Sequence, residues 1–319
     1  MFGSKRLRFP VVCWAILACH SGWAAQPPLV AYELHTHTIA SRFVDQTFEI
    51  YVQVPWSRSD GSERFPVLYL TDSYGGMAFA DTTRIMQLGG DVPRFITVGI
   101  GYKMDSPFHS MEIRQRDLTP VEVENGAGMP PLSTLFKNAP ALNIAKKSGG
   151  AANFLRFIRE ELQPYIDANF PTDPKERGYW GDSLGGLFGL YVLFNQPDTF
   201  NRYIIGSPSV WWSNQAIVND AKAYIKDHDR LDATVYMAVG ALEETAPDGF
   251  SMVTNMFELA TLLRQANLTG LKLTTHLFPN ETHTSVIGMN YSRGIQEVYG
   301  RAPDNFIMKA VMAGPSEAP

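Results

Sequence analysis

A serine at the centre of a Gly-x-Ser-x-Gly pentad is the strongest candidate for chemistry in this chain. The pentad spans residues 181–185, and its serine is Ser183. An aromatic-rich stretch that can form a strand precedes it, and a small, apolar stretch that can form a helix follows. This context is typical of a nucleophile elbow, in which the first N–H groups of the helix stabilise an oxyanion. The alternative is a glycine-rich turn in which the serine is a bystander.

A serine hydroxyl is a weak nucleophile and needs a neighbouring imidazole to accept its proton. His283 is the candidate base, because it follows the last predicted strand after a short loop; the alternative is that it caps the last helix. Glu243 is the candidate acid, three residues beyond Gly240 at the end of another predicted strand, and Glu244 and Asp248 are the alternatives. Nucleophile, acid and base then occur in the order that this architecture uses.

A second oxyanion donor is expected in the loop after the predicted strand at residues 65–72. This strand is a nearly continuous apolar run that breaks into a loop with two glycines, as a central parallel strand does. In a hydrolase of this architecture, a backbone N–H of that loop completes the oxyanion hole. Tyr74 is the candidate residue and Ser73 the next one. The alternative is an ordinary strand-to-helix turn.

Two further features are candidates for substrate contacts. Trp211 and Trp212 follow a short predicted strand at 203–206, where they could line an acyl or aromatic pocket or belong to the core. The charged segment 114–120 is either a structural, salt-bridged turn, which we favour, or an element that recognises an anion. Arg116 is its candidate substrate contact.

The elements that must position these residues alternate between strands and helices. Together they predict a single α/β domain with a mostly parallel central sheet and helices on both faces. Ligands gather beyond the carboxyl ends of the strands in such sheets, where Ser183, Glu243 and His283 are expected. The predicted strands are 32–39, 47–54, 65–72, 95–101, the stretch that leads into residue 181, 203–206, 233–240 and 272–278. The predicted helices are 77–88, the one after Ser183, 151–168 with a kink or end near Pro164, 216–226, 252–265 and a last one to about 299.

Residues from about 102 to 150 contain many Pro, Gly and Asn residues and are expected to be irregular. A long irregular segment within a compact domain is commonly functional, so this one is a candidate lid over the pocket. We therefore expect one hydrolase domain over 25–319 that carries a lid-like region at about 102–150.

The first 24 residues are typical of a signal peptide, with a basic start, an apolar core and small residues before a cleavage point after Ala24. The apolar run is too short to span a membrane. An alternative interpretation makes Cys19 a lipid-modified N-terminus, because the residues before it loosely resemble a lipobox. Either interpretation predicts an exported protein, periplasmic or secreted.

Composition excludes several other classes. The 319 residues carry a formal net charge of −5 and no basic stripe, so we expect no nucleic-acid partner. Both cysteines, Cys13 and Cys19, lie in the leader, so the mature domain has no disulfide, thiol nucleophile or cysteine metal site. No cofactor and no metal are expected, and the sequence does not indicate an oligomeric state.

Four separate segments carry a resemblance to a known family. They are 116–120, 154–158, 181–186 and 281–286, and they resemble the putative-esterase family of α/β-hydrolases. The best-known members of this family are ferric-siderophore esterases, and feruloyl esterases, acetyl esterases and mycolyltransferases are more distant relatives. The resemblance covers about residues 30 to 300.

This resemblance implies an α/β-hydrolase fold with Ser183 as nucleophile, His283 as base and the Leu184 N–H as one oxyanion donor. Some siderophore esterases are described as using a Ser–His dyad, so the role of Glu243 transfers least directly. The mature chain shows no obvious basic cluster that would bind a polyanionic ferric catecholate. The resemblance therefore defines the family more closely than it defines the substrate.

The sequence thus predicts an exported serine esterase that acts through an acyl-enzyme on Ser183. Its expected partner is a small-molecule ester, of the siderophore type or another. One alternative is an acyltransferase of the mycolyltransferase type. The other is a non-catalytic binding protein on a hydrolase scaffold.

Overall fold

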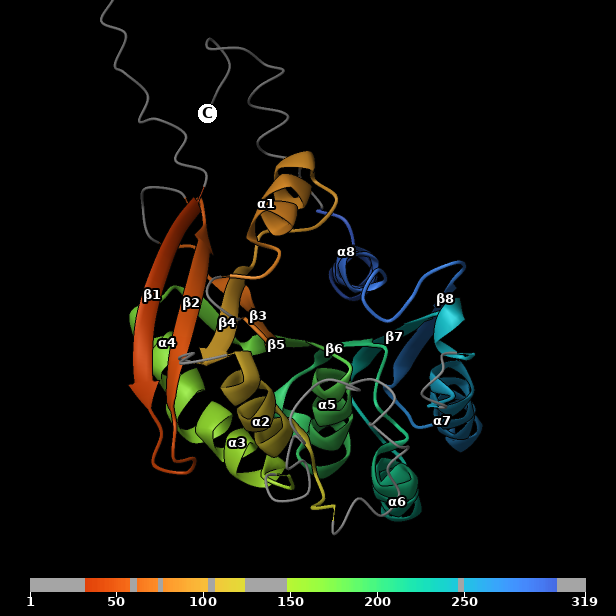
Figure 1. The fold of residues 1–319 in the computed structure, drawn as a ribbon. Helices are drawn as coiled ribbons and strands as arrows, with labels where there is room; N and C mark the ends of the chain where they lie inside the picture. Colours follow the sequence, from red (N-terminus) through yellow and green to blue (C-terminus); the bar gives the residue numbers. More distant parts are fainter. Residues whose placement is uncertain are drawn as a thin grey trace, which may run out of the picture. The chain divides into compact units, whose positions relative to one another are not determined.

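The computed structural model describes residues 32–57, 62–73, 77–102, 107–123, 148–245 and 250–302. Eight strands in these residues form one sheet in the order β1-β2-β4-β3-β5-β6-β7-β8 (Figure 1). The β1–β2 and β2–β4 pairs are antiparallel, and every pair from β4 to β8 is parallel. The strands are β1 (Tyr32–Ala40), β2 (Thr47–Pro55), β3 (Phe65–Leu70), β4 (Ile96–Tyr102), β5 (Thr172–Asp182), β6 (Arg202–Gly206), β7 (Thr234–Gly240) and β8 (Lys272–Phe278).

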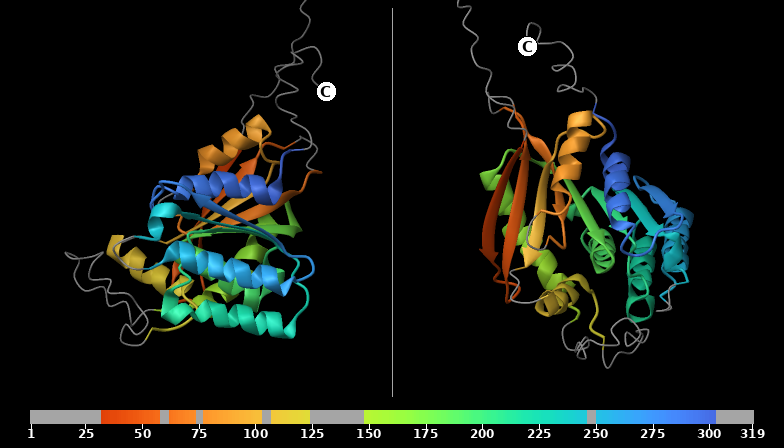
Figure 2. Two further views of the ribbon diagram at one scale, coloured as in Figure 1. Left: turned by 90° about the vertical axis from the view of Figure 1, so that its right-hand side faces the viewer. Right: turned by 45° about the horizontal axis from the view of Figure 1, so that its top comes forward.

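Helices cover both faces of this sheet (Figures 1 and 2). On one face lie α2 (Pro107–Leu118), α3 (Ala151–Phe157), α4 (Gln163–Asn169), α5 (Leu184–Asn195), α6 (Trp212–Asp227) and α7 (Met252–Ala266). On the other face lie α1 (Ala80–Gly89) and α8 (Ile287–Tyr299). Three short turns complete the described elements: η4 (Ile158–Leu162), η5 (Pro197–Thr199) and η6 (Ala241–Glu243).

Each face of the sheet has its own apolar core. Side chains alternate along a strand, so Val67 and Tyr69 of β3 enter the core under α2 to α7, while Leu68 and Leu70 enter the core under α1 and α8. The central strand β4 is buried at all seven positions. Strands buried on both faces explain why the sequence shows continuous apolar runs at 65–72 and 95–101 rather than strict alternation.

Two helical segments differ from the prediction. The first is α2, which occupies Pro107–Leu118 within the stretch that was expected to be irregular. Its twelve residues include few apolar ones, so helical periodicity is hard to see in the sequence. The rest of the predicted lid, residues 124–147, lies outside the described residues.

The second is the predicted helix 151–168, which runs from Ala151 to Asn169 but contains the π-helical turn η4. In this turn the Gln163 N–H donates to the Ile158 carbonyl, five residues back. Proline has no N–H to donate, and Pro164 follows this turn at the start of α4. The irregularity expected near Pro164 therefore takes the form of a π-helical turn, which is wider than a regular α-helical turn.

No helix in the described part of the chain is both long and apolar enough to cross a bilayer. The predicted signal peptide at 1–24, with Cys13 and Cys19, lies outside the described residues.

Candidate active site

Ser183 occupies a strained turn between β5 and α5. Its backbone angles are φ 61° and ψ −116°, in a region that residues with a side chain rarely adopt. The flanking glycines make the turn possible, because a β-carbon at Gly181 would lie 2.5 Å from the carbonyl of Gly185. A β-carbon at Gly185 would in turn lie 2.7 Å from the Thr71 hydroxyl oxygen. The local geometry is that of a nucleophile elbow.

The Ser183 hydroxyl is only partly buried, so it remains reachable. Its Oγ lies 3.4 Å from Ser209 Oγ, and the Ser209 N–H donates to the Ser183 carbonyl at 3.1 Å. Leu184 is the first residue of α5, and an N–H at this position has no acceptor within the helix. The Leu184 N–H therefore has the local setting expected of an oxyanion donor.

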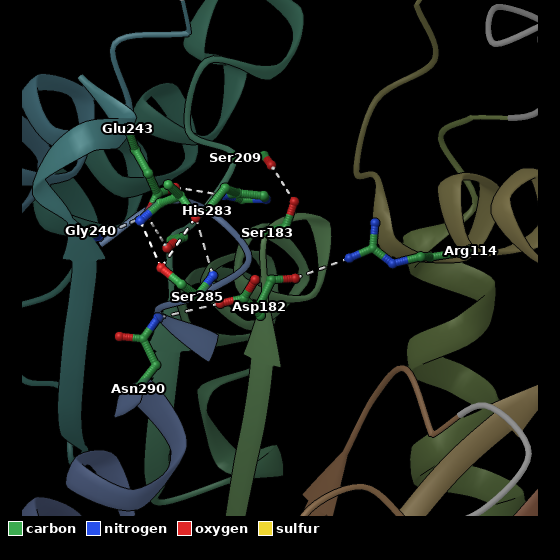
Figure 3. Close-up of polar contacts among 11 residues, drawn as sticks. Arg114, Asp182, Ser183, Ser209, Gly240, Glu243, His283, Ser285 and Asn290 are labelled. Atoms are coloured by element: carbon green, nitrogen blue, oxygen red, sulfur yellow. Dashed lines mark hydrogen bonds and ion pairs between the residues drawn. The ribbon is translucent and has the colours of Figure 1, made fainter. Parts of the chain in front are cut away.

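Glu243 is held by three hydrogen bonds directly after β7. The residue is 2% exposed and lies in η6. One carboxylate oxygen, Oε1, accepts from the Ser207 hydroxyl and from the Gly240 N–H, both at 2.7 Å. The other, Oε2, lies 2.6 Å from His283 Nδ1 (Figure 3). A buried carboxylate with this set of partners can orient an imidazole and stabilise its protonated form.

The two alternative acids do not share this position. Glu244 turns to the start of α7, where its Oε1 accepts from the Thr254 hydroxyl at 2.6 Å and its Oε2 accepts from the Thr254 N–H at 2.9 Å. Asp248 lies outside the described residues. Among the acids that the structure describes, Glu243 is thus the one that contacts His283.

His283 lies between β8 and α8, and its side chain is 43% exposed. Burial lowers the pKa of His283, but the hydrogen bond that its Nδ1–H donates to Glu243 and the negative charges of Asp182 and Glu243 outweigh it and raise the pKa above its ordinary value. Figure 3 shows the imidazole extending toward Ser183. No hydrogen bond joins the two side chains among the described contacts, and catalytic hydrogen bonds are often long in unliganded enzymes. The predicted Ser183–His283 bond stays a prediction.

Asp182, the residue before the serine, is buried behind the site. Its Oδ1 accepts from Asn290 Nδ2 at 3.4 Å. Burial raises the pKa of Asp182 to about 7, and the opposing positive charges of His283 and Arg114 do not cancel this effect. A carboxyl group that titrates near neutrality therefore lies next to the candidate nucleophile.

Arg114 of α2 joins two strand ends beside Ser183. Its guanidinium forms a two-point ion pair with Asp72, at 2.7 and 3.1 Å, and its Nη2 also donates to the Asp182 carbonyl at 3.1 Å. Asp72 follows β3, and Asp182 ends β5. Sequence reasoning treated the segment 114–120 mainly as a salt-bridged turn and did not single out this arginine.

The expected substrate contact Arg116 instead pairs with its buried neighbour Asp117, with Nε 2.6 Å from Oδ1. This is the salt-bridged turn that the sequence favoured, and it gives no support to substrate binding by Arg116.

The two tryptophans that follow β6 differ in how deeply they are buried. Trp212 is 2% exposed and donates its Nε1–H to the Val121 carbonyl at 3.0 Å, so it is a core residue rather than a pocket wall. Trp211 is partly buried and stacks on Phe250 with ring centroids 4.1 Å apart.

Of the two candidates for the second oxyanion donor, Ser73 is among the described residues. Tyr74 lies outside the described residues. The Ser73 N–H, which was the second candidate, donates to the Ile100 carbonyl at 3.1 Å and is therefore occupied. Within the described part of the chain, no group of three or more side chains could hold a metal ion.

The chain resembles known proteins in both sequence and structure. The family model described as "Putative esterase" matches residues 41–278. The ferri-bacillibactin esterase BesA of Bacillus subtilis strain 168 is 30% identical over 266 residues, which cover 81% of this chain and 86% of that protein. The structure of the BES protein from Bacillus cereus has a TM-score of 0.69 at 28% identity, and covers 86% of this chain and 98% of that one. The siderophore hydrolase EstA from Aspergillus nidulans has a TM-score of 0.69 at 27% identity, with the same two coverages.

The sheet order, the helices on both faces and these structural neighbours define an α/β-hydrolase fold. The family match goes further. The chain belongs to the putative esterase family, and it is an esterase.

Proposed function

We propose that this chain is an exported serine esterase that hydrolyses a siderophore-type or other small carboxylic ester through an acyl-enzyme on Ser183. The observation that carries the proposal is the Glu243–His283 contact of 2.6 Å at the edge of the sheet where the strained Ser183 turn also lies. Backbone strain at a polar residue and a buried carboxylate paired with an imidazole are together typical of a catalytic centre.

In this mechanism Ser183 Oγ attacks the ester carbonyl carbon while His283 Nε2 accepts the hydroxyl proton. The carbonyl oxygen becomes an oxyanion, which the Leu184 N–H stabilises together with a backbone N–H from the loop after β3, where Tyr74 is the candidate. The intermediate collapses, the ester C–O bond breaks, and His283 returns the proton to the leaving alcohol. Water then attacks the acyl-enzyme with His283 as base, which releases the acid and restores Ser183.

Glu243 has two roles in this scheme. It accepts the Nδ1–H of His283, so the second ring nitrogen is left free to receive the serine proton. It also stabilises the imidazolium that forms in each half-reaction. The raised pKa of His283 is consistent with the second role.

The substrate class comes from the relatives, since BesA is described as a ferri-bacillibactin esterase and EstA as a siderophore hydrolase. The main cation beside the site, Arg114, is already paired with Asp72. This arrangement gives no particular support to a highly anionic ferric complex, so other small esters stay within the proposal. The leader at 1–24 supports export, by cleavage or through a lipid on Cys19.

Hydrolysis and acyl transfer share the acyl-enzyme on Ser183 and differ in whether water or an alcohol reaches it. Product analysis with and without an added alcohol acceptor separates the two activities.

The decisive experiment is an ester panel of short-chain acyl, feruloyl and trilactone siderophore substrates, assayed with the wild type and Ser183→Ala. The wild type is expected to hydrolyse at least one of these esters and to be labelled by a fluorophosphonate. Ser183→Ala should fold normally, resist labelling and lose activity by roughly 10⁴- to 10⁶-fold. Hydrolysis by the folded variant at the wild-type rate would exclude Ser183 as nucleophile, and a folded wild type that resists labelling would favour a binding protein.

A further inference from the structure

The hydroxyl of Ser207 lies directly behind the candidate acid. Its Oγ donates to Glu243 Oε1 at 2.7 Å, and the Gly240 N–H donates to the same oxygen at the same distance. These two donors fix Oε1, so that Oε2 is the oxygen that faces His283. Ser207 is fully buried, so no water can replace its hydroxyl without local rearrangement.

The backbone of Ser207 is strained. Its φ is 36°, in the left-handed region, although the residue has a side chain and is followed by Pro208. Its N–H donates to the Ala238 carbonyl of β7 at 2.7 Å, which ties the end of β6 to the strand that leads to Glu243. Glycine would adopt this conformation without penalty, so the side chain itself accounts for the presence of serine.

From these contacts we infer that Ser207 is a positioning residue of the esterase site, which fixes the carboxylate of Glu243 so that it presents one oxygen to His283. This inference rests on the function proposed above, and it assigns a fourth member to the Ser183, His283 and Glu243 group. A carboxylate removed from water needs its hydrogen-bond donors to stay in one rotamer. Loss of one donor allows it to tilt, and small displacements near a reacting group cost large factors in rate.

The neighbouring acid supplies a matched control. Glu244 also accepts a hydroxyl donor, from Thr254 at 2.6 Å, but this carboxylate does not contact His283. A Thr254→Val variant therefore removes an exposed hydroxyl–carboxylate hydrogen bond, to the residue next to Glu243 in the chain. It should leave kcat and KM unchanged.

The test compares Ser207→Ala and Ser207→Gly with the wild type and Thr254→Val, on whichever ester the panel identifies. Both Ser207 variants should lose about ten- to hundredfold in kcat with little change in KM, as expected for a hydrogen bond to a charged group. They should also weaken or shift the downfield proton NMR signal of the His283 Nδ1–H bond. Ser207→Gly guards against misfolding of the alanine variant, because glycine accepts the left-handed backbone.

Wild-type kcat in a folded Ser207 variant would overturn the inference, and so would a loss of stability with an unchanged His283 proton signal. A rise in KM alone would also overturn it, since it would indicate a substrate contact. These outcomes are separate from failure of the proposed function, which is decided by Ser183→Ala. If Ser183→Ala is inactive while Ser207→Gly matches the wild type, only the role of Ser207 fails.

Discussion

Polar groups lie at both the carboxyl and the amino ends of the parallel strands, but the two ends differ in backbone strain and in the burial of charge. At the carboxyl ends, Asp72, Ser183 and Ser207 follow β3, β5 and β6 with φ values of 61°, 61° and 36°. The carboxylates of Asp182 and Glu243 are buried beside them. Strain and buried charge therefore occur together at this edge, and each has a cost that the rest of the fold must offset.

At the amino ends, a cavity of about 330 Å³ is lined by residues of β5 and α6 and of the segments just before β6 and β7. Its ion pair of Arg230 with Asp232 is largely exposed, and such a pair adds little to stability. The other arginine in its lining, Arg177, pairs with Asp167 and is partly buried. The proposed reaction centre thus coincides with buried charge on strained backbone, and not with a hollow with charged walls.

The largest effect that would test this comparison is expected from Glu243→Gln. In the proposed mechanism His283 must be neutral to accept the serine proton, so kcat/KM should rise with pH through a pKa above the ordinary histidine value of about 6.5. Glutamine removes the negative charge that raises this pKa, so the inflection should move to lower pH. We also expect kcat to fall on the order of 10³- to 10⁴-fold, by analogy with loss of the acid in a serine triad.

Glu244→Gln is the control for that variant, and its pH–rate profile should overlay that of the wild type. A Glu243→Gln profile that also overlays the wild type would indicate a Ser–His dyad. The buried carboxylate of Glu243 would then not contribute to activity at the carboxyl ends of the strands.

The next largest effect is expected from Arg114→Met. The variant removes the link between Asp72 and the Asp182 carbonyl, so the loop after β3 is no longer fixed relative to Ser183. We expect kcat/KM to fall about ten- to hundredfold, as misplacement near a reacting group does. Arg116→Met is the comparison, because it removes the ion-pair partner of the buried Asp117 and should lower the free energy of unfolding with little effect on kcat. The reverse pattern would make Arg116 the functional arginine.

A moderate, pH-dependent effect on stability is expected from Asp182→Asn. The pKa of Asp182 is about 7 in the fold, above its ordinary value of 3.8, so the folded protein favours the protonated carboxyl. The stabilising contribution is complete below about pH 4 and is lost as pH rises through 7. Urea unfolding should therefore show the variant gaining stability over the wild type at pH 8.5 relative to pH 5.5. A constant difference between the two pH values would contradict the shifted pKa.

The smallest effect is expected at the amino ends. Arg230→Ala removes an exposed ion pair with Asp232 and should leave kcat/KM within about twofold of the wild type, with an unchanged unfolding midpoint. A large kinetic effect in an ester assay would mean that the cavity at this end communicates with the site, and the contrast between the two edges would no longer hold.

The fold was largely predictable because buried strands and glycine-rich turns act locally. The runs at 65–72 and 95–101 became β3 and β4 within two residues at each end, and the elbow around Ser183 has the predicted conformation. The α/β-hydrolase fold is confirmed. The helix α2 was missed because its sequence carries too few apolar residues to show a period.

The candidate site was predictable only where chain order and strand ends determine position. Glu243 and His283 each follow a strand, and adjacent parallel strands bring their ends together. Ser207 and Arg114 were not assigned roles in the site, because their partners lie 36 to 68 residues away and depend on strand register. For Trp212 the sequence left a pocket and a core position open, because a tryptophan after a strand end has the same signal in both, and the structure buries it in the core.

The π-helical turn η4 has a consequence for how the long helical segment before β5 meets the sheet. Its buried apolar residues Phe154, Ile158, Leu162 and Ile166 are each four positions apart. On a regular α-helix of 3.6 residues per turn, such a row would drift by about 40° at every step and leave the contact surface. The wider π-helical turn offsets part of this rotation about the helix axis, so the four side chains stay on the same face. Deleting one residue between Ile158 and Leu162 would give spacings of four, three and four, which also lie on one face of a regular α-helix, so we expect Ile166 to keep its place in the row without the π-helical turn.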